Sequence, residues 1–106
     1  MIKYFATLAL LFASACSQPH SEASIPSFPA RTDYSDARAQ LLKAGWSPIP
    51  AECGNGYLCF EEFPELATRL SDATNSGLFS SGNSKIRVHT QPIADGQLVE
   101  RVEHVR

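Results

Sequence analysis

The strongest repeating pattern in the chain lies between Asp33 and Ala44, and it predicts one amphipathic helix. Apolar side chains recur there at helical spacing, at Tyr34, Ala37, Leu41 and Ala44, with Leu42 alongside. Asp33 suits the N-cap position, and Gly45 suits the residue that follows the last turn. The opposite side of this helix is expected to face solvent, with Arg38, Gln40 and Lys43.

The middle of the chain alternates between short apolar stretches and turn-forming residues. Residues 46–50, with two prolines, predict an extended segment, and residues 57–63 predict a strand that ends at Pro64. Leu66 and Leu70 are four residues apart, so residues 65–73 are expected to form a short helix. Residues 74–84 are rich in Gly, Ser and Asn and predict a loop, with room for a short strand at Leu78 and Phe79.

Strand-like alternation at the C-terminus predicts a hairpin between residues 85–93 and 97–105. A two-residue turn at Asp95 and Gly96 would place Arg87 opposite His104. A three-residue loop over residues 94–96 places Arg87 opposite Glu103 instead. We favour the three-residue loop because it separates an apolar face, with Ile86, Val88, Leu98 and Val102, from a polar face, with Arg87, His89, Arg101 and Glu103.

The preferred register has two further consequences. It leaves Glu100 on the apolar face, which is a mismatch, and it sets His104 opposite Ile86, where partial burial is expected. Together these elements predict an α+β fold. One amphipathic helix would pack on a small antiparallel sheet of three or four short strands that ends in the C-terminal β-hairpin.

The first residues have the composition of an export signal. Lys3 is followed by a nearly unbroken apolar stretch over residues 4–15, which is too short to span a bilayer. The sequence Ala13-Ser14-Ala15-Cys16 then resembles the lipobox of bacterial lipoproteins, although that family prefers Leu where Ala13 stands. The resemblance implies removal of residues 1–15 and lipidation of Cys16. Cleavage by ordinary signal peptidase after Ala15 is the alternative and would give a secreted or periplasmic soluble protein.

Residues 16–32 follow as a lipidated cysteine and a flexible tether rich in Ser and Pro, and residues 33–106 form the folded domain. The lipobox resemblance implies a lipid anchor in the bacterial cell envelope. Because Ser17 rather than Asp follows the cysteine, it also implies the periplasmic face of the outer membrane.

Of the three cysteines, Cys53 and Cys59 remain after Cys16 is set aside, and an even pair in an exported protein predicts a disulfide. The bond would close a Gly-rich loop with Tyr57 and Leu58 at its tip, a candidate contact feature for a partner. We prefer the simpler interpretation that the bond stabilises the fold. A metal site would need two ligands besides these cysteines, and His89 and His104 are the only candidates in the domain. We favour the disulfide over this alternative, so no metal or cofactor is expected.

A longer motif runs through the predicted helix and beyond it, Tyr34-x-x-Ala37-Arg38-x-x-Leu41-x-x-x-Gly45-Trp46-x-Pro48. It resembles the opening of small exported bacterial domains with paired cysteines. It is also loosely similar to the helix-on-sheet units of beta-lactamase-inhibitor proteins and PASTA modules. Such domains often carry further cysteines near their middle, where this chain has Arg69 and a Ser/Asn-rich stretch. The resemblance bears on the fold and assigns no activity.

The sequence contains no arrangement of residues typical of an enzyme. The carboxylates of Glu61, Glu62 and Glu65 are expected to form a solvated acidic rim, and a net charge of −2 without a basic stripe excludes nucleic acid as an expected partner. We therefore expect a membrane-anchored lipoprotein with a non-catalytic binding or interaction module and an unknown protein partner. The alternatives are a secreted inhibitor-like protein that acts on an envelope or extracellular enzyme, and an accessory lipoprotein of envelope assembly.

Overall fold

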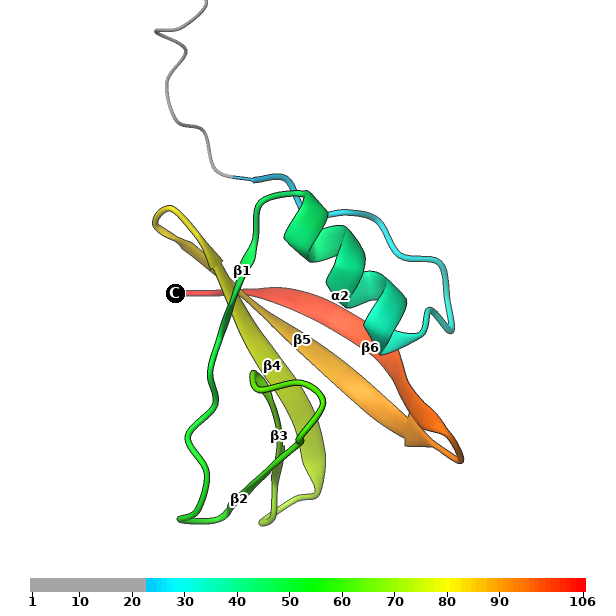
Figure 1. Cartoon of the computed structure of the whole chain (residues 1–106), viewed down its shortest axis with the longest axis vertical. Helices are drawn as coiled ribbons and strands as arrows, with labels where there is room; N and C mark the ends of the chain where they lie inside the picture. The colour runs from blue at the N-terminus through cyan, green and yellow to red at the C-terminus, as the bar shows by residue number, and fades with distance from the viewer. Residues whose placement is uncertain (1–22) are drawn as a thin grey trace, which may run out of the picture.

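The computed structural model describes residues 23–106, which fold into one helix and a six-stranded antiparallel sheet (Figure 1). The elements are α2 (Tyr34–Lys43), β1 (Ser47–Ile49), β2 (Tyr57–Cys59), β3 (Leu66–Arg69), β4 (Thr74–Ser81), β5 (Ser84–Ile93) and β6 (Gly96–Val105). The α+β prediction agrees with this architecture, but the sheet has more strands than the three or four expected. The predicted signal peptide and Cys16 lie outside the described residues. Within residues 23–106, no helix is long and apolar enough to cross a membrane.

The sheet is an antiparallel meander in the order β2-β3-β4-β5-β6, to which β1 adds a short extension. Strand β3 pairs with residues 74–77 of β4, whereas β1 pairs with residues 78–80 farther along the same strand. Two strands therefore share one edge of β4. This arrangement joins the segment after the helix to the centre of the sheet.

The predicted helix is confirmed, together with the residues that begin and end it. The Asp33 carboxylate accepts a hydrogen bond of 3.0 Å from the Ser35 amide at the first turn. At the other end, the Gly45 amide donates to Leu42 O (3.1 Å) and the Trp46 amide donates to Leu41 O (2.9 Å). This pattern needs Gly45 in the left-handed region, and its φ is +102°.

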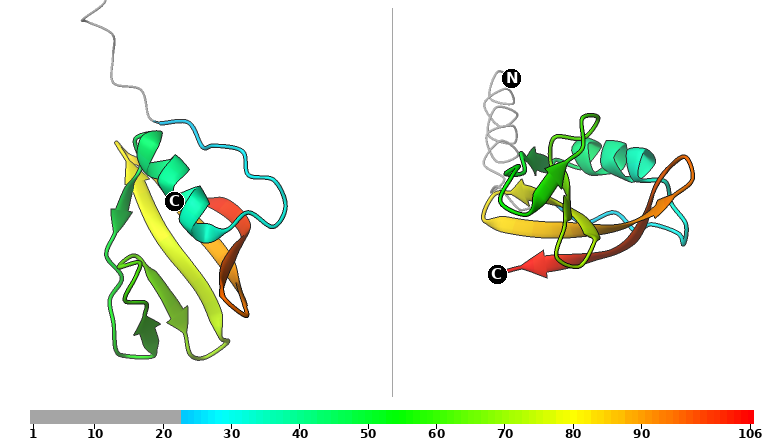
Figure 2. Two further views of the ribbon diagram at one scale, coloured as in Figure 1. Left: turned by 45° about the vertical axis from the view of Figure 1, so that its right-hand side comes forward. Right: turned by 90° about the horizontal axis from the view of Figure 1, so that it is seen from below.

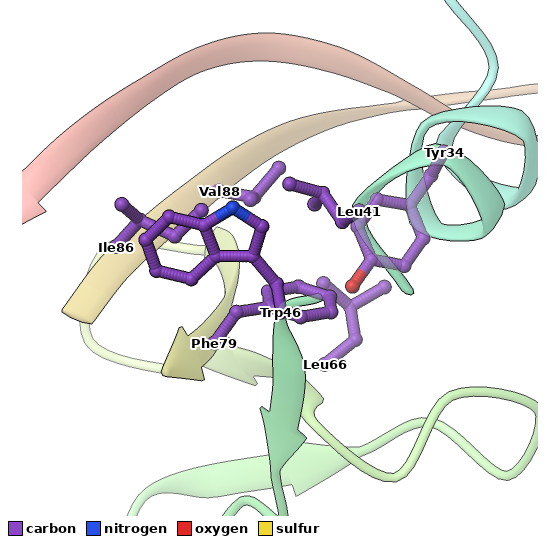
Figure 3. Close-up of a cluster of buried hydrophobic side chains, with 7 residues drawn as sticks. All are labelled: Tyr34, Leu41, Trp46, Leu66, Phe79, Ile86 and Val88. Atoms are coloured by element: carbon purple, nitrogen blue, oxygen red, sulfur yellow. The ribbon is translucent and has the colours of Figure 1, made fainter. Parts of the chain in front are cut away.

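Helix α2 covers one face of the sheet, and the hydrophobic core lies between them (Figures 2 and 3). The helix buries Tyr34, Ala37 and Leu41, as its periodicity predicts. The core cluster consists of Tyr34, Leu41, Trp46, Leu66, Phe79, Ile86 and Val88. Trp46 is buried at the start of the segment that enters β1, so it anchors the helix on the sheet.

Residues 23–32 pack on the domain, which corrects the predicted tether through residue 32. The Trp46 indole donates a hydrogen bond to Ser24 O (2.9 Å), and the Ala23 amide donates to Ser81 Oγ (3.1 Å). Ile25 and Phe28, which lie among the prolines of this segment, pack against the hydrophobic core and are partly buried there. Rich Ser and Pro content excluded regular secondary structure here but did not exclude packing.

Two predictions for the middle of the chain are wrong. The segment expected to be a second helix forms β3, in which Leu66 is fully buried while Leu70, just past its end, is 54% exposed. The segment expected to be a loop forms β4, whose buried positions include Asn75 and Gly77. Polar or small residues at inward positions hide the two-residue alternation from sequence inspection. The strand predicted over residues 57–63 is shorter than expected.

The C-terminal hairpin forms with a different turn from the one we favoured. Ile93 pairs with Gly96 across a two-residue turn, and a bulge beside Thr90 leaves Glu100 unopposed. Beyond the bulge, Arg87 faces Glu103 as predicted. The bulge explains the mismatch at Glu100, because this residue is exposed instead of entering the core.

The bulge also changes which side chains of β6 reach the core. Val99 and Val102 both pack against the core. They are three positions apart, and their side chains point to the same face of the sheet because the bulge inserts one extra residue between them. His104 faces Ile86 as predicted, but it is exposed rather than partly buried.

Candidate functional site

The predicted disulfide between Cys53 and Cys59 is present, with a Cα–Cα distance of 5.5 Å. Gly54 and Tyr57 exchange two backbone hydrogen bonds of 3.0 and 3.1 Å across a tight turn. The loop tip is therefore Asn55 and Gly56, both with positive φ, and not Tyr57 and Leu58. Those two residues lie in β2 with exposed side chains. Tyr57 lines a cleft on the sheet, and Leu58 is not among its lining residues.

We expect replacement of both Cys53 and Cys59 by serine to lower the free energy of unfolding by about 2 kcal/mol, because the bond closes only a short loop. Urea unfolding of the oxidised protein and of the double variant measures this difference. Equal stability would show that the disulfide does not stabilise the domain.

The sheet face opposite α2 carries no element of the described chain and is hollowed into a cleft of about 730 Å³. Strand pairing sets its side chains in register. Ser76 and Leu78 lie on β4, at the centre of the sheet. On the neighbouring strand β5, His89 is opposite Ser76 and Arg87 is opposite Leu78. The lining also includes Ile49, Tyr57, Ala67, Arg69, Thr74, Arg101 and Glu103. Apolar, basic and acidic side chains thus share one open surface.

The cleft lining combines four basic side chains, Arg69, Arg87, His89 and Arg101, with three carboxylates, Glu52, Glu65 and Glu103. One of the basic groups has no acidic partner in the described chain. Arg69 is paired with Asp72, and Nε2 of His89 lies 2.5 Å from Glu103 Oε1. Half-buried Arg87 donates to Ser76 Oγ (3.2 Å), and none of the ion pairs formed within residues 23–106 includes it. The cleft therefore holds a guanidinium whose charge is available to a ligand.

The pKa of Glu103 is lowered, first by its hydrogen bond with His89, and further by the nearby charges of His89, Arg101 and Arg87. The pKa of Asp72 is also lowered, chiefly by the hydrogen bond from Arg69. Both carboxylates are thus held in the charged form by basic side chains of the same face.

The hairpin half of this surface was predicted from the sequence. Arg87, His89, Arg101 and Glu103 lie on the face away from the core, as the preferred register indicated. The other half was missed, because β3 and β4 were not recognised as strands. Once the alternation of β4 is known, the outward positions of Ser76 and Leu78 follow from it directly.

Ser76, His89 and Glu103 lie on three neighbouring strands, an order that invites comparison with a hydrolytic triad. The hydrogen bonds do not fit that chemistry. Nε2 of His89 engages Glu103, while Ser76 Oγ accepts from Arg87 and has no hydrogen bond with the imidazole. A serine nucleophile needs a base in hydrogen-bond reach. Within the described part of the chain, no group of three metal-ligating side chains occurs either.

A second polar cluster is buried beneath the helix. Glu65 Oε2 accepts hydrogen bonds from Tyr34 Oη (2.6 Å) and Arg38 Nε (2.7 Å), and Arg38 Nη2 lies 3.2 Å from Glu65 Oε1. Phe63 packs edge-on against the Tyr34 ring, with 4.9 Å between centroids. The predicted acidic rim is therefore wrong for Glu65, whose side chain is fully buried. Arg38 likewise turns inward rather than to solvent, because its length lets it reach the carboxylate.

Gly77 of β4 makes room for this cluster. A β-carbon there would lie 3.1 Å from Glu65 Cγ and 3.2 Å from Tyr34 Oη, closer than side chains normally approach. Burial raises the pKa of Glu65, but hydrogen bonds from Arg38 and Tyr34 outweigh it, and the net pKa is lowered. The pKa of Tyr34 is raised by burial and by the same carboxylate. Glu65 thus stays charged and links α2 to the start of β3.

The lowered pKa of Glu65 predicts loss of stability in acid. Its contribution is complete above the unfolded-state pKa of about 4.3 and disappears as the pH falls through the lower folded-state pKa. We expect the stability difference between the wild type and Glu65→Gln to shrink between neutral pH and about pH 3. Urea unfolding at both pH values measures it. A difference independent of pH would contradict a charged Glu65.

Comparison of the chain with protein-family models, curated proteins and solved structures finds no match. The site must therefore be interpreted from its own geometry.

Proposed function

We propose that this protein is a non-catalytic binding module that engages another envelope component through the open face of its sheet. The cleft of about 730 Å³ on that face carries the proposal. Its volume lies within the range of ligand-binding pockets. Its lining combines apolar side chains, among them Ile49, Ala67 and Leu78, with a larger number of polar and charged groups. The hydrogen bonds of Ser76 and His89 favour recognition over nucleophilic catalysis.

The proposal includes a lipid anchor on Cys16. Since Ala23 already contacts the domain through Ser81, seven residue steps separate it from the cysteine and reach at most about 25 Å. Ala23, Ile25 and Phe28 pack on the core side of the sheet, opposite the cleft. An anchored domain would therefore stay near the membrane with its attachment on the helix side, which leaves the cleft accessible to a partner.

The anchor is tested by the intact mass of the protein purified from its native membrane. We expect a chain that begins at Cys16 and carries acyl groups, with a further increase of about two mass units on reduction of the disulfide. An unacylated mass would remove the anchor from the proposal and favour a secreted form, without bearing on the cleft.

Two leucines allow a matched test of the binding face. Leu78 lies in the floor of the cleft, whereas Leu42 is exposed on the helix side. After crosslinking of envelopes, we expect Leu78→Glu to lose a partner that the wild type and Leu42→Glu both retain. Circular dichroism confirms that each variant is folded. A partner retained by Leu78→Glu but lost from Leu42→Glu would place binding on the other face and reject the proposal.

The identity of that partner separates the remaining alternatives. A hydrolytic enzyme would support an inhibitor-like role, and a complex of assembly proteins would support an accessory role.

A further inference from the structure

We infer that the cleft binds an acidic segment of a partner polypeptide, with Arg87 as the main contact for a carboxylate. This inference rests on the proposed function and specifies the chemistry of the ligand. Four observations support it: the charge of Arg87, which has no ion-pair partner within residues 23–106, the way the face holds its own carboxylates, the apolar floor, and the position of the described N-terminal segment.

Arg87 occupies the centre of the face in a geometry that can accept an anion. It lies on β5 between Leu78 of β4 and Glu103 of β6, and its side chain is half-buried. Its one described side-chain hydrogen bond goes to the neutral Ser76 hydroxyl, at 3.2 Å. A guanidinium presents five N–H donors, so most of its capacity for planar carboxylate oxygens is not used.

The face already binds carboxylates from its own chain. His89 binds Glu103 and Arg69 binds Asp72, so each of these basic groups is paired with an internal acid. Glu103 faces Arg87 directly across the strands, yet its carboxylate is directed to His89. An incoming acid would pair with Arg87, which takes part in no ion pair within residues 23–106. It would also experience repulsion from Glu103, which makes Glu103 a useful probe.

The floor beside Arg87 is apolar, and this favours a polypeptide over a simple anion. Ile49 and Leu78 face each other on β1 and β4, Ala67 lies next to Ser76, and Tyr57 forms a wall. An extended segment presents alternate side chains to such a face at intervals of about 7 Å. One acidic side chain can therefore reach Arg87 while an apolar neighbour rests on Leu78.

The position of the N-terminal segment argues against an anionic membrane surface as the occupant. Ala23 and Phe28 lie on the core side of the sheet, whereas Arg87 lies on the opposite face. A chain attached to the membrane from the core side does not need the cleft to face the bilayer. A hollow with an apolar floor also matches a protruding segment better than a flat surface.

The inference is tested by fluorescence anisotropy with a labelled peptide composed of glutamate, leucine and serine, and with its counterpart in which glutamine replaces glutamate. At low salt we expect the wild-type domain to bind the acidic peptide at least about tenfold more tightly. Arg87→Gln should remove that preference. Arg31→Gln, which changes the same charge at an exposed position outside the cleft lining, should retain it.

Glu103→Gln supplies a test that loss of folding cannot imitate. Because it removes the internal negative charge opposite Arg87, it should bind the acidic peptide several-fold more tightly than the wild type. Weaker binding by Glu103→Gln, or equal binding of the two peptides by the wild type, would overturn the inference. Vesicles of phosphatidylglycerol bound through Arg87 in preference to the acidic peptide would overturn it as well.

This inference and the proposed function fail in different experiments. If the wild type binds neither peptide but its partner is still lost in Leu78→Glu, the acidic-segment inference is wrong and the binding face stands. If partner capture does not depend on Leu78, the binding face itself is rejected.

Discussion

Replacement of Glu65 by alanine is expected to lower the free energy of unfolding by about 3–5 kcal/mol, because it leaves the charge of Arg38 without its partner beneath the helix. The Tyr34 hydroxyl loses its acceptor at the same time. Since native proteins have a total stability of about 5–15 kcal/mol, the variant should lose a large fraction of its stability. Urea unfolding followed by circular dichroism measures the loss.

Two further variants show whether the loss comes from this cluster. Glu62→Ala removes an exposed carboxylate from the same stretch and should change stability by less than about 0.5 kcal/mol. Tyr34→Phe removes only the hydroxyl donor and should cost about 1–2 kcal/mol, so it remains measurable if Glu65→Ala does not fold. Equal stability of Glu65→Ala and Glu62→Ala would contradict the buried ion pair.

Leu41→Ala is expected to be the other strongly destabilising substitution, at about 2–5 kcal/mol. Leu41 is 0% exposed in the core cluster between α2 and the sheet, so truncation leaves a cavity among Trp46, Phe79 and their neighbours. Leu42→Ala is the matched control, because the same side chain one residue later is 41% exposed. We expect it to cost less than about 1 kcal/mol.

Thermal and urea unfolding of the two leucine variants test how the helix faces the sheet. A larger loss for Leu42→Ala than for Leu41→Ala would mean that α2 is rotated relative to the structure described here. Similar losses would mean that both side chains are buried in solution, by a partner or by a second copy of the chain.

The helix could be predicted from the sequence because its signals are local. The apolar period, the Asp33 cap and the Gly45 terminator lie within a few turns of one another, and each has a direct physical meaning. The central strands could not be predicted, because β4 places Asn75 and Gly77 at inward positions. Gly77 is small to accommodate Glu65 and Tyr34, a requirement set by tertiary contacts that no local pattern reveals.

The candidate site divides in the same way. Arg87, His89, Arg101 and Glu103 were assigned to one face from the hairpin alternation alone. Arg69, Ser76 and Leu78 reach that face through the pairing of β3 and β4, which depends on residues distant in sequence. The burial of Glu65 and Arg38 could not be predicted either. Charged residues usually face solvent, and the sequence does not show that these two pair with each other inside the fold.

The two polar clusters have separate roles in this account. Glu65 joins α2 to the sheet from within, so the helix side is occupied by structural contacts. The opposite face carries basic, acidic and apolar side chains that no other element of the described chain covers. We therefore expect a partner to bind the open face of the sheet. The contacts that stabilise the fold lie on the other face, beneath α2.

The most direct test of this account places a photo-crosslinking amino acid at position 78 or position 42 of the full-length protein in growing cells. We predict a discrete crosslinked partner from position 78, in the cleft, and none from position 42, on the helix side. The same partner crosslinked only from position 42 would contradict the assignment of the open sheet face as the binding surface.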